Sequence, residues 1–336
     1  MYKIQIKDLG ALYARIAEIM ELFLPVRAGD STVFSRWTED VVDIDFDTLK
    51  VSKSPKEFFL PQYEVLYKST VTTTPSGQTD IPLAPEPLAT RPFALFGVRA
   101  CDMAGIDVLD NVFICPPTDY FYKARRDMAY IITLSCPFAA PTCFCTAFGV
   151  DPSHPGGDVS AWIEGEEMYW KSLTENGDIL IESLSDLLVA TQYEPKPIEQ
   201  PIGFSLEHLK QDELMEIFNS PAWDELHQTC IACGACTFIC PTCQCYDISD
   251  FGGGETIRSR CWDSCMYSDF TLMAHGNPRQ TQKERFRQRF MHKLMYHPAN
   301  FDGQWGCVGC GRCVNKCPAG LNIVKVIKNL GVYAHA

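Results

Sequence analysis

Two short runs of cysteine constrain this sequence more than any other feature. Each has the spacing C-x2-C-x2-C-x3-C followed directly by proline, and the prolines are Pro241 and Pro318. In proteins with two 4Fe-4S clusters, this spacing places three thiolates around one cluster and sends the fourth to the other. We therefore predict two interlocked 4Fe-4S clusters. The first would be bound by Cys230, Cys233, Cys236 and Cys317, and the second by Cys307, Cys310, Cys313 and Cys240.

Zinc is the main alternative to iron and sulfide, because C-x-x-C pairs are common zinc ligands. Two complete copies of the longer spacing favour iron–sulfur clusters over zinc. A disulfide framework fits this spacing less well than zinc does. Close to each run, Gly234, Gly309 and Gly311 suit a loop that turns tightly and directs backbone N–H groups at sulfide. We expect these glycines to shape the cluster loops.

The whole chain limits where such a protein works. The first residues, MYKIQIKDLG, lack the apolar region of an export signal, and nowhere do 18 apolar residues follow one another without a charge. We therefore expect a cytoplasmic protein with no membrane insertion, where dense cysteines more often bind metal or carry redox chemistry than pair as disulfides. The formal net charge of -13 argues against a nucleic-acid partner, which calls for a basic face.

Composition divides the chain into successive regions. We predict an N-terminal α/β segment over residues 1–90, an α/β domain over 91–193, a linker at 194–203, and a cluster domain over 204–336 with an insertion at 246–306. In the first region a helix is expected to begin after Asp8 and to stop at Pro25. Its apolar positions would be Leu12, Ile16, Ile19 and Phe23.

The second region has the order strand, helix, strand. The apolar runs at 93–98 and 128–134 flank a helical segment at 102–113, an order typical of a parallel sheet. Residues 159–184 are expected to add a small antiparallel unit with a hairpin turn at Asn176-Gly177. The predicted fold class is thus α/β, or α+β, with a parallel sheet. A C-terminal two-cluster domain of the bacterial ferredoxin type, helical and irregular with an insertion, would follow it.

Four cysteines of the second region predict a third metal site. Cys101 and Cys136 each follow a predicted strand, so both would lie at the carboxyl edge of the sheet. Cys143 and Cys145 are separated by one residue, which directs their thiols the same way in an extended segment. We favour a third 4Fe-4S cluster at these four cysteines over isolated core residues. Cys115 lies outside this geometry and is predicted to be a buried small hydrophobe.

The insertion contains a basic amphipathic helix near residues 279–297. Phe286, Phe290 and Leu294 form one face, and the adjacent column consists of Arg285, Arg289 and Lys293. One interpretation is a solvated basic face over a packed apolar stripe. The other is compensation of the negative charge that the clusters bring, which would raise their potentials. The histidines of the sequence show no ligand pattern.

Several longer motifs resemble one known family over nearly the whole chain: GVRACD at 97–102, CFC at 143–145, CPTCQCY at 240–246, RCWDSC at 260–265, ERFRQRF at 284–290 and CVGCGRC at 307–313. Together they are similar to the beta subunits of cytosolic sulfhydrogenases, which are NiFe hydrogenases that also reduce sulfur, and to the A-type iron–sulfur subunits of anaerobic sulfite reductases.

This resemblance implies a 4Fe-4S electron-transfer subunit of a multisubunit anaerobic oxidoreductase. Its partners would be a flavin- and NAD(P)-binding subunit of the ferredoxin-NADP reductase type and a terminal catalytic subunit. The terminal subunit could be of hydrogenase, sulfite reductase or heterodisulfide reductase type. The family's motifs fall on Cys243, Cys245 and Cys265, which are either sulfurs packed beside a cluster or alternative ligands. Cys261 lies outside them and is expected to be structural.

Two rival functions remain open at this point. In the first, Cys243, Cys245 and Cys265 form or flank an unusual cluster that binds substrate directly, which would make the chain a reductase subunit with its own reactive site. In the second, the chain is an interaction module that uses zinc only to fold. No dinucleotide-binding, phosphate-binding, zinc-protease or nucleophile motif marks an independent catalytic site.

Overall fold

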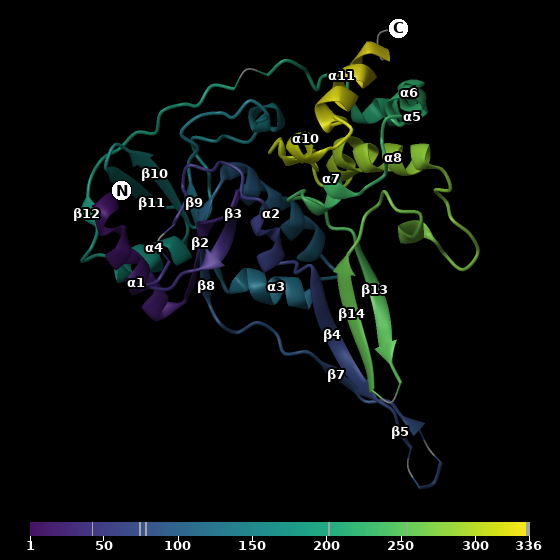
Figure 1. The fold of residues 1–336 in the computed structure, drawn as a ribbon, viewed down its shortest axis with the longest axis horizontal. Coiled ribbons are helices and arrows are strands. Elements are labelled where there is room, and N and C mark those ends of the chain that lie inside the picture. Colours follow the sequence, from purple (N-terminus) through teal and green to yellow (C-terminus); the bar gives the residue numbers. More distant parts are fainter. Residues whose placement is uncertain (42, 74, 78, 201, 254, 334–336) are drawn as a thin grey trace.

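A mixed sheet of eight strands forms the core of the N-terminal half of the protein (Figure 1). The computed structural model describes residues 1–41, 43–73, 75–77, 79–200, 202–253 and 255–333. The strand order is β12-β1-β11-β10-β9-β8-β2-β3. The strands are β1 (Tyr2–Gln5), β2 (Glu21–Ala28), β3 (Ser31–Arg36), β8 (Phe93–Val98), β9 (Ala129–Leu134), β10 (Val159–Glu164), β11 (Glu167–Ser172) and β12 (Val189–Ala190).

The centre of this sheet is parallel, as the sequence predicts. β8 pairs in parallel with both β2 and β9, and β9 pairs in parallel with β10. Every residue of β8 is buried, which is typical of a strand covered on both faces. One face packs against α1 (Leu9–Ile19) and α4 (Glu175–Ser183), and the other against α2 (Ala100–Phe113) and α3 (Tyr120–Asp127).

The first predicted helix is shorter than expected. Asp8 stands at the N-cap of α1 and Leu12 and Ile16 are fully buried, but the helix ends at Ile19 and Phe23 belongs to β2. Pro25, predicted to stop the helix, lies inside β2 opposite Phe34. β2 tolerates the proline because its parallel pairing with β8 ends at Phe23, so no ladder bond to β8 is lost there.

The predicted turn at Asn176-Gly177 is wrong. β10 and β11 do form an antiparallel hairpin, but the residues after it fold into α4 instead of a further strand. Thr174 caps this helix by accepting a hydrogen bond from the backbone N–H of Gly177. A Cβ at Gly177 would lie 2.1 Å from the carbonyl oxygen of Asp158, so the glycine serves close packing and not a hairpin turn.

A second sheet joins the insertion to the N-terminal half. Its strand order is β13-β14-β4-β7, and Figure 1 shows β4, β13 and β14 extending away from the rest of the molecule. The strands are β4 (Tyr63–Thr70), β7 (Leu83–Pro85), β13 (Tyr246–Gly252) and β14 (Glu255–Trp262), and a short pair, β5 (Thr72–Thr73) with β6 (Thr79–Asp80), lies beyond them. The predicted linker at 194–203 has no regular element at 194–200 or 202–203, and residue 201 lies outside the described residues.

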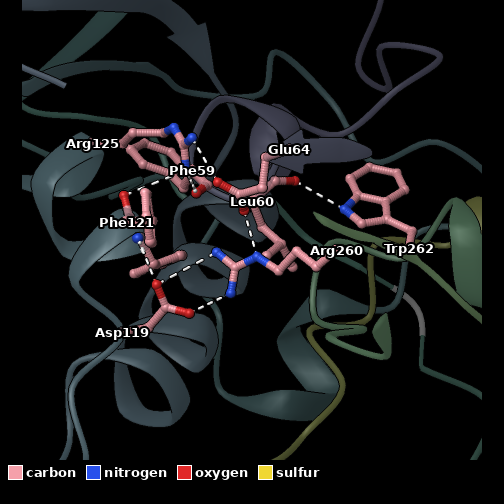
Figure 2. A network of polar contacts seen from close by, with 9 residues as sticks. Phe59, Leu60, Glu64, Asp119, Phe121, Arg125, Arg260 and Trp262 are labelled. Carbon is pink, nitrogen blue, oxygen red and sulfur yellow. Dashed lines mark hydrogen bonds and ion pairs between the residues drawn. The ribbon is translucent and has the colours of Figure 1, made fainter. Parts of the chain in front are cut away.

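A buried arginine holds β14 in place. Arg260 is 3% exposed and forms ion pairs with Glu64 of β4 and with Asp119, the N-cap residue of α3 (Figure 2). Beside it, the Trp262 indole donates a hydrogen bond of 2.9 Å to the carbonyl oxygen of Leu60. These contacts fix the start of the 262–265 segment relative to the first sheet, and this segment ends at Cys265.

The C-terminal part is helical and irregular, which agrees with the predicted fold class. Its helices are α5 (Leu214–Asn219), α6 (Ala222–Leu226), α7 (Ala235–Phe238), α8 (Gln282–Met291), the π-helical η6 (His292–Tyr296), α9 (His297–Asn300), α10 (Arg312–Lys316) and α11 (Ile323–Tyr333). The expected apolar face is confirmed, because Phe286, Phe290 and Leu294 are at most 3% exposed. Among the described residues no helix is both long enough and apolar enough to span a membrane.

Short 3-10 helices connect several of these elements. They are η1 (Ile6–Asp8), η2 (Pro55–Phe58), η3 (Cys145–Phe148), η4 (Gln211–Glu213) and η5 (Asp269–Thr271). η2 and η3 matter for the site, because they bring Lys56 and Cys145 toward the cysteine runs of the C-terminal part.

Candidate iron–sulfur centre

The first predicted set of ligands lines a single cavity. Cys230, Cys233 and Cys236 surround α7, and Cys317 reaches the same cavity from the end of α10. Burial raises the pKa of Cys236, and the charges of its neighbours Cys230 and Cys233 raise it further. The structure thus brings together these four thiols from two distant runs, and Cys313 of the second run lines the same cavity.

The second predicted set also gathers around Cys240. Burial raises the pKa of Cys307 and raises that of Cys310 to about 12, and the neighbouring charge of Cys240 raises both. The pKa of Cys313 is raised by burial and by Cys240 in the same way. Metal ions neutralise the charge of neighbouring thiolates that would otherwise repel one another, so this donor set fits a metal cluster.

The glycines of the cluster loops are required by close packing as well as by backbone conformation. Gly234, Gly309 and Gly311 have φ of +73°, +60° and +74°. An added Cβ would lie 2.3 Å from the Phe144 carbonyl oxygen at Gly309 and 2.0 Å from the Thr142 carbonyl oxygen at Gly311. The loop of the second run therefore packs directly on the 142–145 segment of the N-terminal half.

We expect Gly311→Ala to destabilise the protein much more than Gly165→Ala. Both glycines have positive φ, which costs a residue with a side chain about 1–2 kcal/mol. Only Gly311 also meets another backbone segment, since nothing lies within 4 Å of a Cβ at Gly165. Anaerobic denaturant unfolding followed by circular dichroism would measure both changes. Equal losses of stability would contradict the close packing described here.

Buried basic side chains lie among the cysteines, and burial lowers the pKa of one of them, Lys56. Lys56, Arg289 and Lys293 are 2%, 4% and 5% exposed. No carboxylate among the described residues lies within ion-pair distance of any of them. Although burial opposes its charge, Cys240, Cys243 and Cys307 raise the pKa of Lys293. The solvated-face interpretation of the basic helix is therefore wrong for Arg289 and Lys293, while charge compensation stays a prediction.

Neutral groups hold these cations in position. The Lys293 Nζ donates hydrogen bonds to the Thr242 hydroxyl (2.6 Å) and to the Gly306 carbonyl (2.9 Å). The Lys56 Nζ donates to the Cys243 carbonyl at 3.0 Å and lies 3.9 Å from the centre of the Trp262 ring. No sequence pattern marked Lys56, because its role depends on contacts with residues far along the chain.

The four cysteines of the predicted third site lie near one another, at the carboxyl edge of β8 and β9. Burial raises the pKa of Cys136 to about 11, with Cys143 and Cys145 as contributing neighbours. Burial also raises the pKa of Cys101, which has Cys145 among its charged neighbours. The expected extended segment is wrong at Cys145, which begins the short helix η3. The ligand role of these four cysteines stays a prediction.

Two arginines of the quoted motifs lie at this edge, where Arg312 joins it to the cluster domain and Arg99 bonds within the N-terminal half, and sequence reasoning did not single them out. Arg312 and Asp102 form a buried bidentate ion pair with both N···O distances at 2.7 Å. Arg99 donates to the carbonyl oxygens of Leu134 and Ser135 at the end of β9. Arg99 and Asp102 belong to the motif GVRACD, and Arg312 belongs to CVGCGRC. Charged residues inside these cysteine motifs were the sequence feature that could have identified them.

The remaining cysteines divide into two kinds. Cys243, Cys245 and Cys265 line a small cavity together with Arg289 and Lys293. The expectation for Cys115 is wrong, because its side chain is exposed after the end of α2. Cys261 is also exposed, on β14. All 17 cysteines are free thiols, so no disulfide framework is present.

The comparisons with known proteins agree with this geometry. Residues 229–321 match the family of 4Fe-4S dicluster domains. This part of the chain is therefore a 4Fe-4S dicluster domain. The whole chain is similar to sulfhydrogenase 2 subunit beta of Pyrococcus furiosus, with 29% identity over 330 residues. The match covers 94% of this chain and 93% of that protein. No solved structure matches the chain.

These findings confirm the resemblance to sulfhydrogenase beta subunits that the motifs predict, and they confirm two 4Fe-4S clusters as cofactors. The assignment of individual cysteines to each cluster stays a prediction.

Proposed function

We propose that this chain is the electron-relay subunit of a cytoplasmic, multisubunit anaerobic oxidoreductase. It would pass electrons between a flavin- and NAD(P)-binding partner of the ferredoxin-NADP reductase type and a terminal catalytic subunit. The terminal subunit would be of hydrogenase, sulfite reductase or heterodisulfide reductase type. When bound, each cluster supplies a site that accepts and releases one electron at a time.

One observation supports this proposal: cysteines of the two runs lie beside one another. Cys317 lines the cavity of the first run, and Cys240 is a close neighbour of the second. Cys230, Cys233 and Cys236 would hold the first cluster with Cys317, and Cys307, Cys310 and Cys313 would hold the second with Cys240. Because each run would contribute to both clusters, the two would be kept close together, and a short separation favours electron transfer between them.

The surroundings of the cysteines support a route through the protein. Cys233 is exposed and Ile231 beside it is 66% exposed, which suits entry of an electron from a partner at the first cluster. Further along this route, pairs of cysteines lie close enough to interact electrostatically. They are, in order, Cys236 with Cys240, Cys310 with Cys101, and Cys145 with Cys136. Near the far end, Phe138 is 58% exposed and offers a second contact surface.

The partners are inferred from the relative and from the family that the motifs resemble. The relative is named as one subunit of a sulfhydrogenase, so that protein works in an assembly. By analogy, we assign this chain the place between the flavin-binding partner and the site of terminal chemistry. The buried cations Lys293 and Arg289 would raise the potentials of the clusters by offsetting thiolate and sulfide charge.

We expect anaerobically purified protein to contain iron and acid-labile sulfide in equal amounts, at least about eight of each per chain. After reduction with dithionite, electron paramagnetic resonance should show two interacting clusters, because the interlocked runs hold them close together. Zinc in place of iron, with no visible absorption, would overturn the relay and support a module that uses metal only to fold.

We also propose a third relay cluster at Cys101, Cys136, Cys143 and Cys145. If this is right, the double variant Cys136→Ser/Cys143→Ser should lose about four iron and four sulfide per chain and keep the two clusters of the dicluster domain. Cys115→Ser is the matched control, because its thiol is exposed and away from these four. Unchanged iron in the double variant would return the four cysteines to the role of core residues.

A further inference from the structure

A separate group of three thiols lies outside all the cysteine sets described so far. Cys243 and Cys245 belong to the loop after Pro241, and Cys265 follows β14, yet all three line the same cavity. The backbone N–H of Asp263 donates to the Cys245 carbonyl at 2.9 Å, which joins the two segments. Hydrogen bonds link the thiols of Cys245 and Cys265 and also the thiols of Cys243 and Cys240. The fold therefore brings these sulfurs together through two anchored segments.

The walls of this cavity are positively charged, and Arg289, which lines both this cavity and that of the first run, has an unused hydrogen-bond donor. Arg289 and Lys293 both line it, and Lys56 is held against the Cys243 carbonyl. Arg289 donates to the Cys236 carbonyl at 3.3 Å, but its buried Nε has no hydrogen-bond partner among the described residues. Buried cations and unpaired donors are costly unless an anionic group faces them. The cavity thus has the charge of a site built for a negatively charged group.

We propose that Cys243, Cys245 and Cys265 bind an additional 4Fe-4S cluster whose fourth iron has no cysteine ligand and takes a small sulfur-donor anion, hydrosulfide or an organic thiolate. Three thiolates match the number of cysteines that line the cavity within the described residues. The thiol of Cys240 is hydrogen-bonded to that of Cys243, but we assign it to the second cluster and do not count it as a ligand here. Iron in a sulfide cluster prefers soft sulfur ligands, and the cations of the wall favour an anion over a neutral ligand.

The site is distinct from the relay. Its three cysteines belong neither to the interlocked runs nor to the group at the carboxyl edge of the first sheet. An iron with an open position binds a ligand directly, whereas clusters with four cysteine ligands only carry electrons. Failure of electron transfer to a partner would therefore leave this proposal standing, and loss of this site would leave the relay standing.

The ligands are tested first by iron analysis of Cys265→Ser and Cys245→Ser in the full chain, with Cys261→Ser as the control. Cys261 is exposed and lies only four residues before Cys265. Each of the first two variants should lose about four iron and four sulfide per chain while the reduced spectrum of the interlocked pair is kept. Unchanged iron in both variants would overturn the site. The reduced spectrum of the two clusters in the dicluster domain is kept only if the variant folds. Misfolding therefore cannot be mistaken for loss of one cluster.

The open iron is tested by oxidation with ferricyanide. One ferrous ion should leave and one electron should pass to ferricyanide, so a 4Fe-4S cluster of charge 2+ becomes a 3Fe-4S cluster of charge 1+. Its paramagnetic signal should appear in the unaltered protein, disappear on adding ferrous iron together with dithionite, which returns the electron removed by ferricyanide, and be absent from Cys265→Ser. If no such signal forms, the open position is overturned.

The ligand class is tested with sodium sulfide and 2-mercaptoethanol, each added to the unaltered protein. Either should shift the spectrum of this cluster alone, whereas chloride at the same concentration should not. His292 and His297 also line the cavity. If the three-iron signal forms only in His292→Ala or His297→Ala, an imidazole holds the fourth iron and the proposed anion site is overturned.

Discussion

Replacing Cys317 with serine is expected to remove the cluster of the first cysteine run, although Cys317 belongs to the second. Its thiol lines the same cavity as Cys230, Cys233 and Cys236. Because Cys233 is exposed, loss of the fourth thiolate opens a cluster that already lies at the surface, and such a cluster degrades in solution. Iron and sulfide should each fall by about four per chain, and the spin interaction between the two reduced clusters should disappear.

The reciprocal variant gives this prediction its sharpest control. Cys240→Ser should remove the second cluster, so the signal that survives in each variant identifies which cluster has been lost. Cys115→Ser, at an exposed thiol after α2, should leave iron content and spectrum unchanged. If Cys317→Ser instead kept the first cluster and lost the second, each run would bind its own cluster, and the exchange of ligands between runs would be wrong.

The spacing of cysteines was informative because cluster ligands are fixed by short local loops. Three ligands of each set lie within seven residues, so sequence alone could propose which thiols meet. The parallel pairing of β8 with β9 was predictable for a related reason, since fully buried parallel strands appear as short continuous apolar runs. Placement of Cys101 and Cys136 at one edge followed from that pairing.

Local signals failed where tertiary contacts decided the outcome. Pro25 is a strong helix breaker, yet it lies in β2, because pairing with β8 has already ended there. Asn176-Gly177 is a common hairpin turn, but Thr174 caps a helix at this point and Gly177 packs on the Asp158 carbonyl. In both cases a neighbour that is distant in sequence outweighed the local preference.

The charged surroundings of the clusters were also beyond sequence reasoning. Lys56 lies in an ordinary polar segment, and only the fold places its Nζ at the Cys243 carbonyl and over the Trp262 ring. The basic helix looked equally suited to a solvated face, because helical periodicity cannot tell which side is covered by the rest of the protein. The π-helical turn of η6 carries Lys293 into the interior, and such turns are frequent at functional sites.

The largest expected effect on stability is that of Asp102→Asn, which leaves the charge of Arg312 buried without its carboxylate. Arg312 and Asp102 are 3% and 1% exposed, and their bidentate pair joins α10 of the cluster domain to α2 of the N-terminal half. Removing one partner of a buried ion pair costs about 3–5 kcal/mol. We expect the midpoint of anaerobic denaturant unfolding, followed by circular dichroism, to fall accordingly.

Two further variants test whether the loss of stability comes from the unpaired buried charge or from removing a carboxylate in general. Asp250→Asn removes the partner of Arg258 in a pair that is also bidentate, with distances of 2.6 Å, but exposed to solvent on the β13–β14 hairpin. It should change the midpoint little, because water replaces the lost contact. In Asp102→Asn/Arg312→Met no unpaired charge remains, so much of the lost stability should return. If the double variant were as unstable as Asp102→Asn alone, an unpaired buried charge would not be the cause. The packing of α2 against the cluster domain, where Gly105 meets Pro241, would then have to account for the loss.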